Sequence, residues 1–437
     1  MYRIEPVRKN YAWGSTQRLQ SLFHLDEPGP LAELWFSGHP ESPSVLDVDG
    51  DRINLAEAID RAPEFMLGHE VVQRWGDSLP FLFKIISAQV PLSLQVHPSL
   101  DRAREGFARE SESGLDLSDP CRTFKDPVAK HEMVVALEDF SASVGFLPLR
   151  KQIAALSMVE HPLAHRMVEV LAGADKGKTG AWNAVNQAFR IALGWEEDGT
   201  CREGDPSVSQ AIIRASFGCD PGSPLAHAAR AAEAFPADRS ALAIAMMNPV
   251  ELQQGGSVFI PTGIVHAYLS GTGAEIMTNS DNVLRAGLTG KYKDLPRFLE
   301  NMDCRPAPPL DPSSGLIKMI LQADVVTYRP TLQEFMLAYG HVDPRCQEPD
   351  HWWAVSDRLR QAQARFAQAV GPQHVLASQG GPRVIVCLEG IVRCRTNSQV
   401  LDLKQGEAAF IPASEKSVTV SGGSPAPGSY ILASCAL

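Results

Sequence analysis

An eight-residue stretch near residue 95 carries polar side chains at a spacing that can build a reactive site. Residues 91–98 read Pro-Leu-Ser-Leu-Gln-Val-His-Pro and follow an apolar run at 79–86, so a strand within a β fold is expected. Alternate side chains of a strand share one face. Ser93, Gln95 and His97 then point one way, while the leucines and the valine between them pack behind. Taken alone, the pattern also fits an edge strand with a chance Gln and His.

Two further stretches complete a possible set of metal ligands. Residues 255–268 read as a turn, a short apolar strand, a Pro/Gly turn and a strand that begins at His266. This Pro-x-Gly-x-x-His run is similar to one in the metal-binding half of cupin barrels. The natural carboxylate is Glu132, at the start of the apolar run 130–137. Two imidazoles, one carboxylate and the amide oxygen of Gln95 suit a borderline cation such as zinc, with room for a substrate oxygen.

A polar segment at 274–291 adds charged groups close to the second histidine. Arg285 offers a planar fork suited to phosphate or carboxylate, and Lys291 offers a mobile point charge. Glu275 and Asp281 add two acids to the same segment. The alternative interpretation is a solvated loop of salt bridges, but the closeness to the histidine favours a role in the site.

The composition is that of a large globular protein. With 437 residues, 44% of them hydrophobic, two or three units are expected. Neither an apolar run of about 18 residues nor an apolar signal core is present, so no membrane segment is expected. The eight scattered cysteines predict free thiols in a reducing cytoplasm. The formal charge of −11 disfavours a nucleic-acid surface.

A change in hydrophobic period divides the chain. Short strands and turns dominate 1–147 and 238–308, whereas 148–237 carries apolar residues at helical spacing. After a Pro-rich stretch, 309–437 contains strands built like the earlier ones. The predicted fold is mainly β with an α insertion: two cupin-like β-barrels of jelly-roll type plus a helical domain, with strand character returning near Ala241. Helices are expected at 55–62, 101–112, 151–158, 162–171, 181–193, 207–216, 224–234 and 354–370.

Two tryptophans and two histidines could belong to a functional site by residue type, but we interpret them as structural residues. Trp13 and Trp35 are interpreted as aromatic core residues. His161 and His165 lie four residues apart and could face one cation, but no carboxylate pattern surrounds them. They are interpreted as histidines on a helix surface.

The longer motifs resemble type I phosphomannose isomerases. The matches follow one consistent order over roughly residues 1–300, and the remainder matches only in general cupin character. They are Asn10-Tyr-Ala-Trp-Gly14, Ala32-Glu-Leu-Trp35 with Gly38-His-Pro40, Leu79-Pro-Phe-Leu-Phe-Lys84, Pro91-Leu-Ser-Leu-Gln-Val-His-Pro98, Lys130 with Glu132, residues 261–268, and Ser280-Asp-Asn-Val-Leu-Arg-Ala-Gly-Leu-Thr289 with Lys291.

The resemblance implies a zinc enzyme that interconverts mannose 6-phosphate and fructose 6-phosphate through an enediol. One Zn²⁺ per chain would be the cofactor, and Arg285 the catalytic cation. The implied zinc ligands are Gln95, His97, Glu132 and His266. The implied substrate- and phosphate-binding residues are Ser93, Lys84, Lys291 and Tyr268.

Three residues are candidates for the group that moves the proton between the two carbons. Asp281, Glu275 and Lys130 have suitable types and positions, and Asp281 is ranked first. A positioned acid–base group contributes roughly 10²–10⁴-fold in rate.

One motif departs from the family. The family usually shows Tyr-x-Asp-x-Asn-His-Lys-Pro-Glu before the third ligand, whereas residues 124–132 here read Phe-Lys-Asp-Pro-Val-Ala-Lys-His-Glu. Ala129 therefore replaces a histidine that is sometimes given an acid–base role. His131 shares the face of Ala129 if the strand is regular, and it is one hypothesis that His131 partly substitutes. The other hypothesis is that the family's histidine was never the essential base.

Two other functions are compatible with parts of the pattern. A cupin oxygenase would hold Fe(II) with two His and one carboxylate, but the Gln ligand and the basic pair argue against it. A non-catalytic sugar-phosphate sensor would keep the basic pair without a metal, and loss of turnover after chelation would distinguish it. The expected partner is a sugar phosphate in the cytoplasm, with no nucleic acid, membrane or obligate protein partner.

Overall fold

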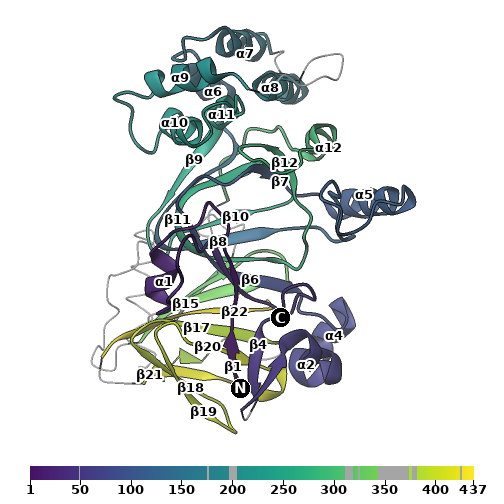
Figure 1. Cartoon of the computed structure of the whole chain (residues 1–437), viewed down its shortest axis with the longest axis vertical. Coiled ribbons are helices and arrows are strands. Elements are labelled where there is room, and N and C mark those ends of the chain that lie inside the picture. Colours follow the sequence, from purple (N-terminus) through teal and green to yellow (C-terminus); the bar gives the residue numbers. More distant parts are fainter. Residues whose placement is uncertain are drawn as a thin grey trace.

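The structure is a computed structural model that describes residues 1–48, 50–174, 177–195, 204–310, 318–322, 325–342, 374–375, 381–423 and 426–437. The helix expected at 354–370 lies outside these residues. Helices of the central part of the chain gather at one end, and the rest consists of sheets with further helices beside them, with both termini in the half away from the gathered helices (Figure 1). Among the described residues, no helix is long and apolar enough to cross a membrane.

One antiparallel sheet carries the predicted ligands. Its main path runs β10-β8-β11-β6-β3-β2, with β9 paired to β8, β7 paired to β11, and β12 paired to β7. Residues directly opposite each other in such pairs share a face. The strands are β2 (Val7–Lys9), β3 (Glu33–Phe36), β6 (Phe81–Ala88), β7 (Leu94–Val96), β8 (Glu132–Phe146), β9 (Met247–Leu252), β10 (Ser257–Ile260), β11 (His266–Thr278) and β12 (Leu284–Gly287).

A second sheet joins the two ends of the chain. Its order is β13-β14-β15-β22-β17-β20-β1-β4-β5, so strands from the first 54 residues pair with the C-terminal ones. The sheet therefore crosses the predicted boundary between the catalytic and C-terminal domains, and the domain limits stay a prediction. The strands are β1 (Tyr2–Glu5), β4 (Val45–Val48), β5 (Asp51–Asn54), β13 (Lys318–Gln322), β14 (Val325–Arg329), β15 (Met336–Val342), β17 (Arg383–Glu389), β20 (Ala408–Ile411) and β22 (Gly428–Ser434).

A small third sheet and a short 3₁₀ helix complete the C-terminal part. The sheet has the order β16-β21-β18-β19. The 3₁₀ helix η2 (Ala413–Glu415) occupies the turn that corresponds to the histidine turn of the first sheet, and that turn carries no histidine. The strands are β16 (His374–Val375), β18 (Ile391–Arg395), β19 (Val400–Lys404) and β21 (Thr419–Gly422).

The observed helices agree with those predicted from hydrophobic periodicity, except near Ala241. The seven helices predicted within the described residues are present within a few residues of their expected limits. The strand expected near Ala241 is wrong, because a short helix lies there and β9 begins only at Met247. The short run Ala-Leu-Ala-Ile is apolar throughout, and periodicity cannot separate a buried helix from a buried strand in such a run. The helices are α1 (Arg18–Leu22), α2 (Leu55–Arg61), α3 (Pro63–Leu67), α4 (His69–Trp75), α5 (Leu100–Glu112), α6 (Leu149–Leu156), α7 (Pro162–Ala172), α8 (Lys178–Leu193), α9 (Pro206–Ala215), α10 (Pro224–Ala234), α11 (Ala241–Ile244) and α12 (Leu295–Asn301).

The helical core continues behind the strand that carries the first ligands. Leu94 and Val96 of β7 are completely buried in the same apolar cluster as α6 to α11. The strand itself is shorter than the predicted 91–98, because Pro91 and Pro98 have no amide N–H to offer to a sheet. Leu92 lies outside β7 and packs against a different cluster. The apolar back of this short strand is thus covered by the helical insertion.

An irregularity in β11 requires a glycine. The pairing of β11 with β8 shifts register on either side of Gly271, whose φ is +117°. A Cβ at this position would lie 2.4 Å from the carbonyl oxygen of Asp139. The strand can therefore make this shift only with a residue that lacks a side chain.

We expect Gly271→Ala to lower the free energy of unfolding by at least about 2 kcal/mol, because the substitution combines a disfavoured φ with a backbone clash. Gly290→Ala is the matched control, since its added methyl would meet nothing within 4 Å. Urea unfolding of the two variants checks this, and equal stabilities would contradict it.

Candidate metal centre and active site

Three side chains from neighbouring strands converge on one point. The possible ligand atoms of His97, Glu132 and His266 all lie within 4.8 Å of one another. His97 directly follows β7, while Glu132 and His266 begin β8 and β11. His97 Nε2 lies 3.0 Å from Glu132 Oε1, and His266 Nε2 lies 3.3 Å from Glu132 Oε2. His97 Nε2 and Glu132 Oε2 are buried without a hydrogen bond, which is the state expected of atoms that serve a cation.

Main-chain carbonyls hold both imidazoles in one orientation. His97 Nδ1 lies 2.8 Å from the carbonyl oxygen of Asn282, and His266 Nδ1 lies 3.0 Å from that of Ile264. A carbonyl accepts only, so each Nδ1 carries the hydrogen and each Nε2 keeps its lone pair in the neutral ring. Burial lowers the pKa of His97 to about 4, which keeps this ring neutral at pH 7.

The carboxylate between the imidazoles is ionised. Burial favours the protonated form of Glu132, but the neighbouring His97 and Lys130 outweigh it and lower the pKa well below its ordinary value. Lys130 Nζ lies 3.2 Å from Glu132 Oε1. Two imidazoles and one carboxylate are a donor set that zinc accepts.

Gln95 lies beside these ligands on the same face of the sheet. It is directly opposite His266 in β11 and opposite Arg285 in β12. Its amide nitrogen lies 3.0 Å from His266 Nε2, and its amide oxygen accepts a hydrogen bond from Ser93 Oγ at 3.2 Å. An amide turned by 180° has the same shape, and it would present its oxygen to the centre and donate to Ser93 instead.

A second row of residues forms the wall next to the metal centre. Lys84 of β6 lies directly opposite both Trp35 of β3 and Glu275 of β11. Its Nζ lies 3.5 Å from a carboxylate oxygen of Glu33 and of Glu275, and 4.7 Å from the Trp35 ring centre. The positive charge of Lys84 is therefore shared between two buried acids.

The carboxyl group of Glu275 has a pKa close to neutrality. Burial raises its pKa to about 7, with Lys84 opposing and the charge of Glu132 adding to the effect. A carboxyl group with a pKa close to neutrality can both accept and return a proton under physiological conditions.

Arg285 and Lys291 form a second cationic region of the site, and its surroundings differ from those of Lys84. Within the described part of the chain, no carboxylate lies within ion-pair distance of either side chain. Burial lowers the pKa of Arg285, and burial together with the charge of Arg285 lowers that of Lys291. Lys291 Nζ lies 5.1 Å from the ring centre of Tyr11. Because burial and mutual repulsion destabilise these two positive charges, an anion that neutralises them would bind favourably.

One cavity of about 590 Å³ brings these groups together. All predicted site residues line it except His97 and His266, which are completely buried beside it. The lining residues with polar or aromatic side chains are Tyr11, Trp13, Glu33, Trp35, Lys84, Ser93, Gln95, Lys130, Glu132, Phe235, Tyr268, Glu275, Asp281, Arg285, Thr289 and Lys291.

Two predictions about aromatic residues are wrong. Trp13 and Trp35 were expected in the core, but both line the cavity. Trp13 stacks on Tyr11 with ring centres 5.8 Å apart, and Trp35 also has Lys9 Nζ 4.4 Å from its ring centre. The apolar character of tryptophan favours burial in a core, whereas Trp35 presents its ring to Lys9 and Lys84, and Trp13 lines the cavity beside Tyr11.

His39 is a residue of the site that the sequence analysis did not single out for a role. Its Nε2 lies 3.0 Å from Asp281 Oδ2, and its Nδ1 accepts a hydrogen bond from the Glu41 amide. The hydrogen bond to Asp281 raises the pKa of His39. The pKa of Asp281 is lowered, because His39 outweighs the burial that opposes it. In the sequence, only the Gly-His-Pro motif at residues 38–40 pointed to His39.

His131 lies outside the cavity. Its ring stacks on Phe259 with centres 6.1 Å apart and planes 9° apart, and it does not line the cavity. Lys130 and Glu132, on either side of it, do line the cavity. The side chain of His131 thus lies on the opposite face of the chain, which argues against the hypothesis that it substitutes for the family's histidine.

The other histidine pair is structural. His161 caps the N-terminus of α7, where its ring accepts a hydrogen bond from the Leu163 amide. Among the residues that the structure describes, the cluster of His97, Glu132 and His266 is the one group found that could hold a metal ion.

Comparisons with known proteins agree on one family. A family model described as the catalytic domain of type I phosphomannose isomerase matches residues 1–149. The chain is 32% identical to a mannose-6-phosphate isomerase of Escherichia coli over 422 residues, covering 95% of each chain. It is 30% identical over 446 residues to the mannose-6-phosphate isomerase of Ogataea parapolymorpha, covering 94% of this chain and 93% of that one.

Solved structures give the same result. A crystal structure of a zinc-bound mannose 6-phosphate isomerase aligns with a TM-score of 0.80 at 29% identity, covering 100% of this chain and 99% of that one. A mutant of phosphomannose isomerase from Salmonella typhimurium also aligns with a TM-score of 0.80, with full coverage of both chains.

We expect His131→Ala to change kcat by less than about threefold, because the ring lies outside the cavity. The variant should lose about 1 kcal/mol of stability, since it loses the contact with Phe259. A coupled assay and urea unfolding measure the two effects, with Glu132→Ala as the inactive reference. A 100-fold fall in kcat for His131→Ala would restore the substitution hypothesis.

Proposed function

Because this chain belongs to the type I phosphomannose isomerases, we propose that it interconverts mannose 6-phosphate and fructose 6-phosphate with one zinc ion per chain. The observation that supports this most is the convergence of His97, Glu132 and His266 beside a wall of acid–base groups in one cavity. A cationic region at the same cavity fits the anionic end of a sugar phosphate. We also propose a cytoplasmic location, since the described cysteines are free thiols.

The zinc ligands are proposed to be Gln95, His97, Glu132 and His266. Hydrogen bonds to main-chain carbonyls leave both imidazole Nε2 atoms available, and two buried polar atoms of the set lack a hydrogen bond. The amide of Gln95 can present its oxygen after a half turn. When bound, zinc supplies a Lewis acid that polarises an oxygen of the sugar.

The proton carrier is proposed to be Glu275 rather than Asp281, which ranked first on sequence. A base is most effective when its pKa is near the working pH, and the pKa of Glu275 is about 7. Asp281 is held in an ion pair with His39 that lowers its pKa, so it is a weaker base. Lys130 is paired with Glu132. The Glu275 carboxylate would take the proton from C2 of the aldose, which leaves an enediolate with its negative charge on O1. After the proton of the C2 hydroxyl has passed to O1, the Glu275 carboxyl group would return its proton to C1, which gives the ketose.

Lys84 is proposed to control Glu275 rather than to bind phosphate. Its Nζ lies between Glu33 and Glu275 and so has its charge matched within the protein. The ammonium lowers the pKa of Glu275 against the effect of burial, which keeps part of the carboxyl group ionised. The family resemblance predicted that Lys84 binds phosphate. We instead assign phosphate binding to residues without acidic partners.

Arg285 and Lys291 are proposed to hold the negative charges of the substrate. Arg285 lies opposite Gln95 and thus next to the reacting end, where its guanidinium can stabilise charge that develops on the sugar oxygens. Lys291 and Ser93 line the same cavity and would bind the phosphate. Tyr268 lines the cavity two residues after His266 and would contact the sugar. Binding energy from the phosphate then orients the carbons for proton transfer.

Removal of the metal by a chelator should abolish turnover of fructose 6-phosphate, and added zinc should restore it. The expected loss is roughly 10³-fold or more in kcat/KM, because the Lewis acid contributes several kcal/mol. Glu132→Ala should not be restored by zinc. Glu138→Ala is the matched control, because Glu138 lies exposed on the same strand and pairs with Arg18. Full activity of the chelated protein would contradict the proposal, and binding without turnover would identify a sensor.

We expect Glu275→Gln to lower kcat by roughly 10²–10⁴-fold with KM changed by less than about threefold. Protonation of Glu275 removes the base, so kcat of the wild type should fall as the pH decreases. The apparent pKa of this limb should lie between the ordinary 4.5 and about 7, because bound zinc adds positive charge. The variant should lack this limb. Exposed Glu300 provides the control Glu300→Gln, and an unchanged profile in Glu275→Gln would contradict the assignment.

A further inference from the structure

A buried polar cluster outside the ligand set reaches the metal centre through His97. We infer that Asp126, Ser280 and Asn282, here called the Asn282 cluster, are positioning residues that fix the orientation of His97 and so set the affinity for the metal. This inference rests on the zinc site of the proposed function. Neither the ligand set nor the acid–base groups include these three residues.

The first observation is that the acceptor for His97 belongs to a segment without sheet pairing. Asn282, whose carbonyl accepts the hydrogen bond from His97 Nδ1, lies between the end of β11 at Thr278 and the start of β12 at Leu284. No strand pairing includes residues 279–283 in the described chain. Because no strand ladder fixes the direction of this carbonyl, other contacts must hold it.

The side chain of Asn282 supplies most of that support. Asn282 is completely buried, and its amide nitrogen lies within 3.0 Å of three oxygens on Asp126 and Val128. Its amide oxygen accepts a hydrogen bond from the Lys125 amide at 2.8 Å. Both ends of the side chain are thus tied to residues 125–128, which are more than 150 positions away in the sequence.

Asp126 holds the same segment from the other side. Its carboxylate accepts hydrogen bonds from Ser280 Oγ, from the Asp281 amide and from the Asn282 side chain, at 2.8, 2.8 and 3.0 Å. A further bond comes from the Val128 amide at 3.0 Å. Four donors around one carboxylate leave it no freedom to rotate. The cluster therefore fixes Asp281, which faces the cavity, as well as the Asn282 carbonyl.

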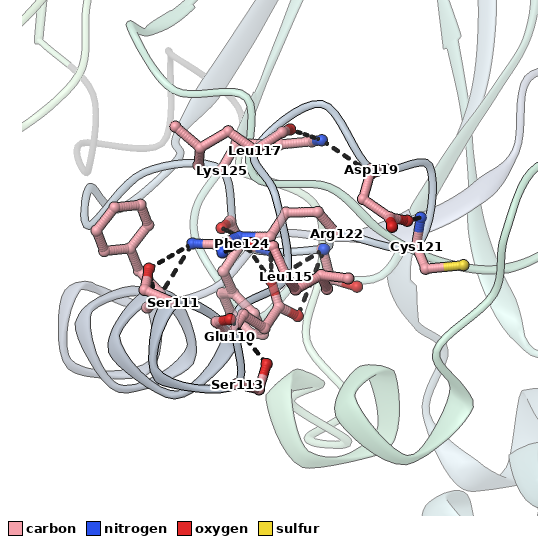
Figure 2. Close-up of polar contacts among 12 residues, drawn as sticks. Glu110, Ser111, Ser113, Leu115, Leu117, Asp119, Cys121, Arg122, Phe124 and Lys125 are labelled. Carbon is pink, nitrogen blue, oxygen red and sulfur yellow. Dashed lines mark hydrogen bonds and ion pairs between the residues drawn. The ribbon is translucent and has the colours of Figure 1, made fainter.

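The residues before Asp126 are themselves anchored. Figure 2 shows Arg122 reaching from the loop after α5 toward carbonyl oxygens and the side chains of Glu110 and Ser111. Arg122 Nε lies 3.2 Å from Glu110 Oε2, and the same carboxylate accepts hydrogen bonds from the amides of Thr123 and Phe124. The loop is thus bound to α5 up to the residue before Lys125. This gives the Asn282 cluster a rigid base.

Loss of the Asn282 cluster should change metal affinity more than it changes the stability of the fold. If the Asn282 side chain is removed, the carbonyl loses its fixed direction, and His97 is no longer held with Nε2 toward Glu132 and His266. Groups that orient a metal-binding histidine typically change metal affinity 10–100-fold when they are removed. A residue that only stabilises the fold would not change zinc affinity to this degree.

The test compares two buried asparagines. Asn248 is also buried and donates from its amide to two main-chain oxygens, Val144 O and Ala307 O, but neither oxygen is the one that accepts from His97 or His266 Nδ1. For the full-length protein, zinc affinity is measured by chelator competition, and stability of the metal-free form by urea unfolding. We expect Asn282→Ala to weaken zinc binding 10–100-fold. Asn248→Ala should leave zinc affinity within about threefold while it also loses stability.

The outcomes separate this inference from the proposed function. If the wild type binds no zinc, the proposed function fails. If the wild type binds zinc and Asn282→Ala binds it equally well, or if both asparagine variants weaken it equally, the positioning role is overturned. Should Asn282→Ala not fold, Ser280→Ala serves instead, since it removes one of the four donors to Asp126. A three- to tenfold loss of zinc affinity in Ser280→Ala supports the role, and an unchanged affinity overturns it.

Discussion

The direction of two buried imidazoles is the constraint on which the active site depends. His97 and His266 each bind a main-chain carbonyl through Nδ1, and each thereby presents Nε2 to the same point near Glu132. The rings meet because β7 and β8 both pair with β11, which places three distant parts of the chain side by side. The sheet order is therefore as much a part of the metal centre as the ligands.

Charge is distributed unevenly around the cavity, and this distribution gives each region its chemistry. On the side of the metal, Lys84 and Lys130 are matched by Glu33, Glu275 and Glu132. Such pairing sets protonation states but leaves little net charge for a ligand. Arg285 and Lys291 have no comparable partner among the described residues, so this part of the cavity attracts an anion. In the proposed function, a substrate with one anionic end would thereby be oriented with its other end at Glu275.

The helical insertion supports the site from behind. Leu94 and Val96, on the back of β7, are buried in the core that α6 to α11 form, and Gln95 between them faces the ligands. Figure 1 shows these helices grouped at the end of the molecule nearest β7 and β12. The insertion also brings Phe235 to the cavity wall. It is thus a structural support of the site as well as a separate helical unit in the sequence.

Local patterns in the sequence predicted a mainly β fold with a helical insertion, and the family resemblance added most of the polar residues that line the cavity, but Trp13 and Trp35 were predicted wrongly. Alternation on a strand and helical spacing are local properties, so Gln95, His97 and the helix at 224–234 could be predicted without coordinates. Other features depend on contacts between distant segments. The pKa of Glu275 comes from burial and from Lys84, and the outward face of His131 comes from packing against Phe259. Solvent exclusion and through-space charge have no signature in a linear order of residues, and only the tertiary structure could decide them.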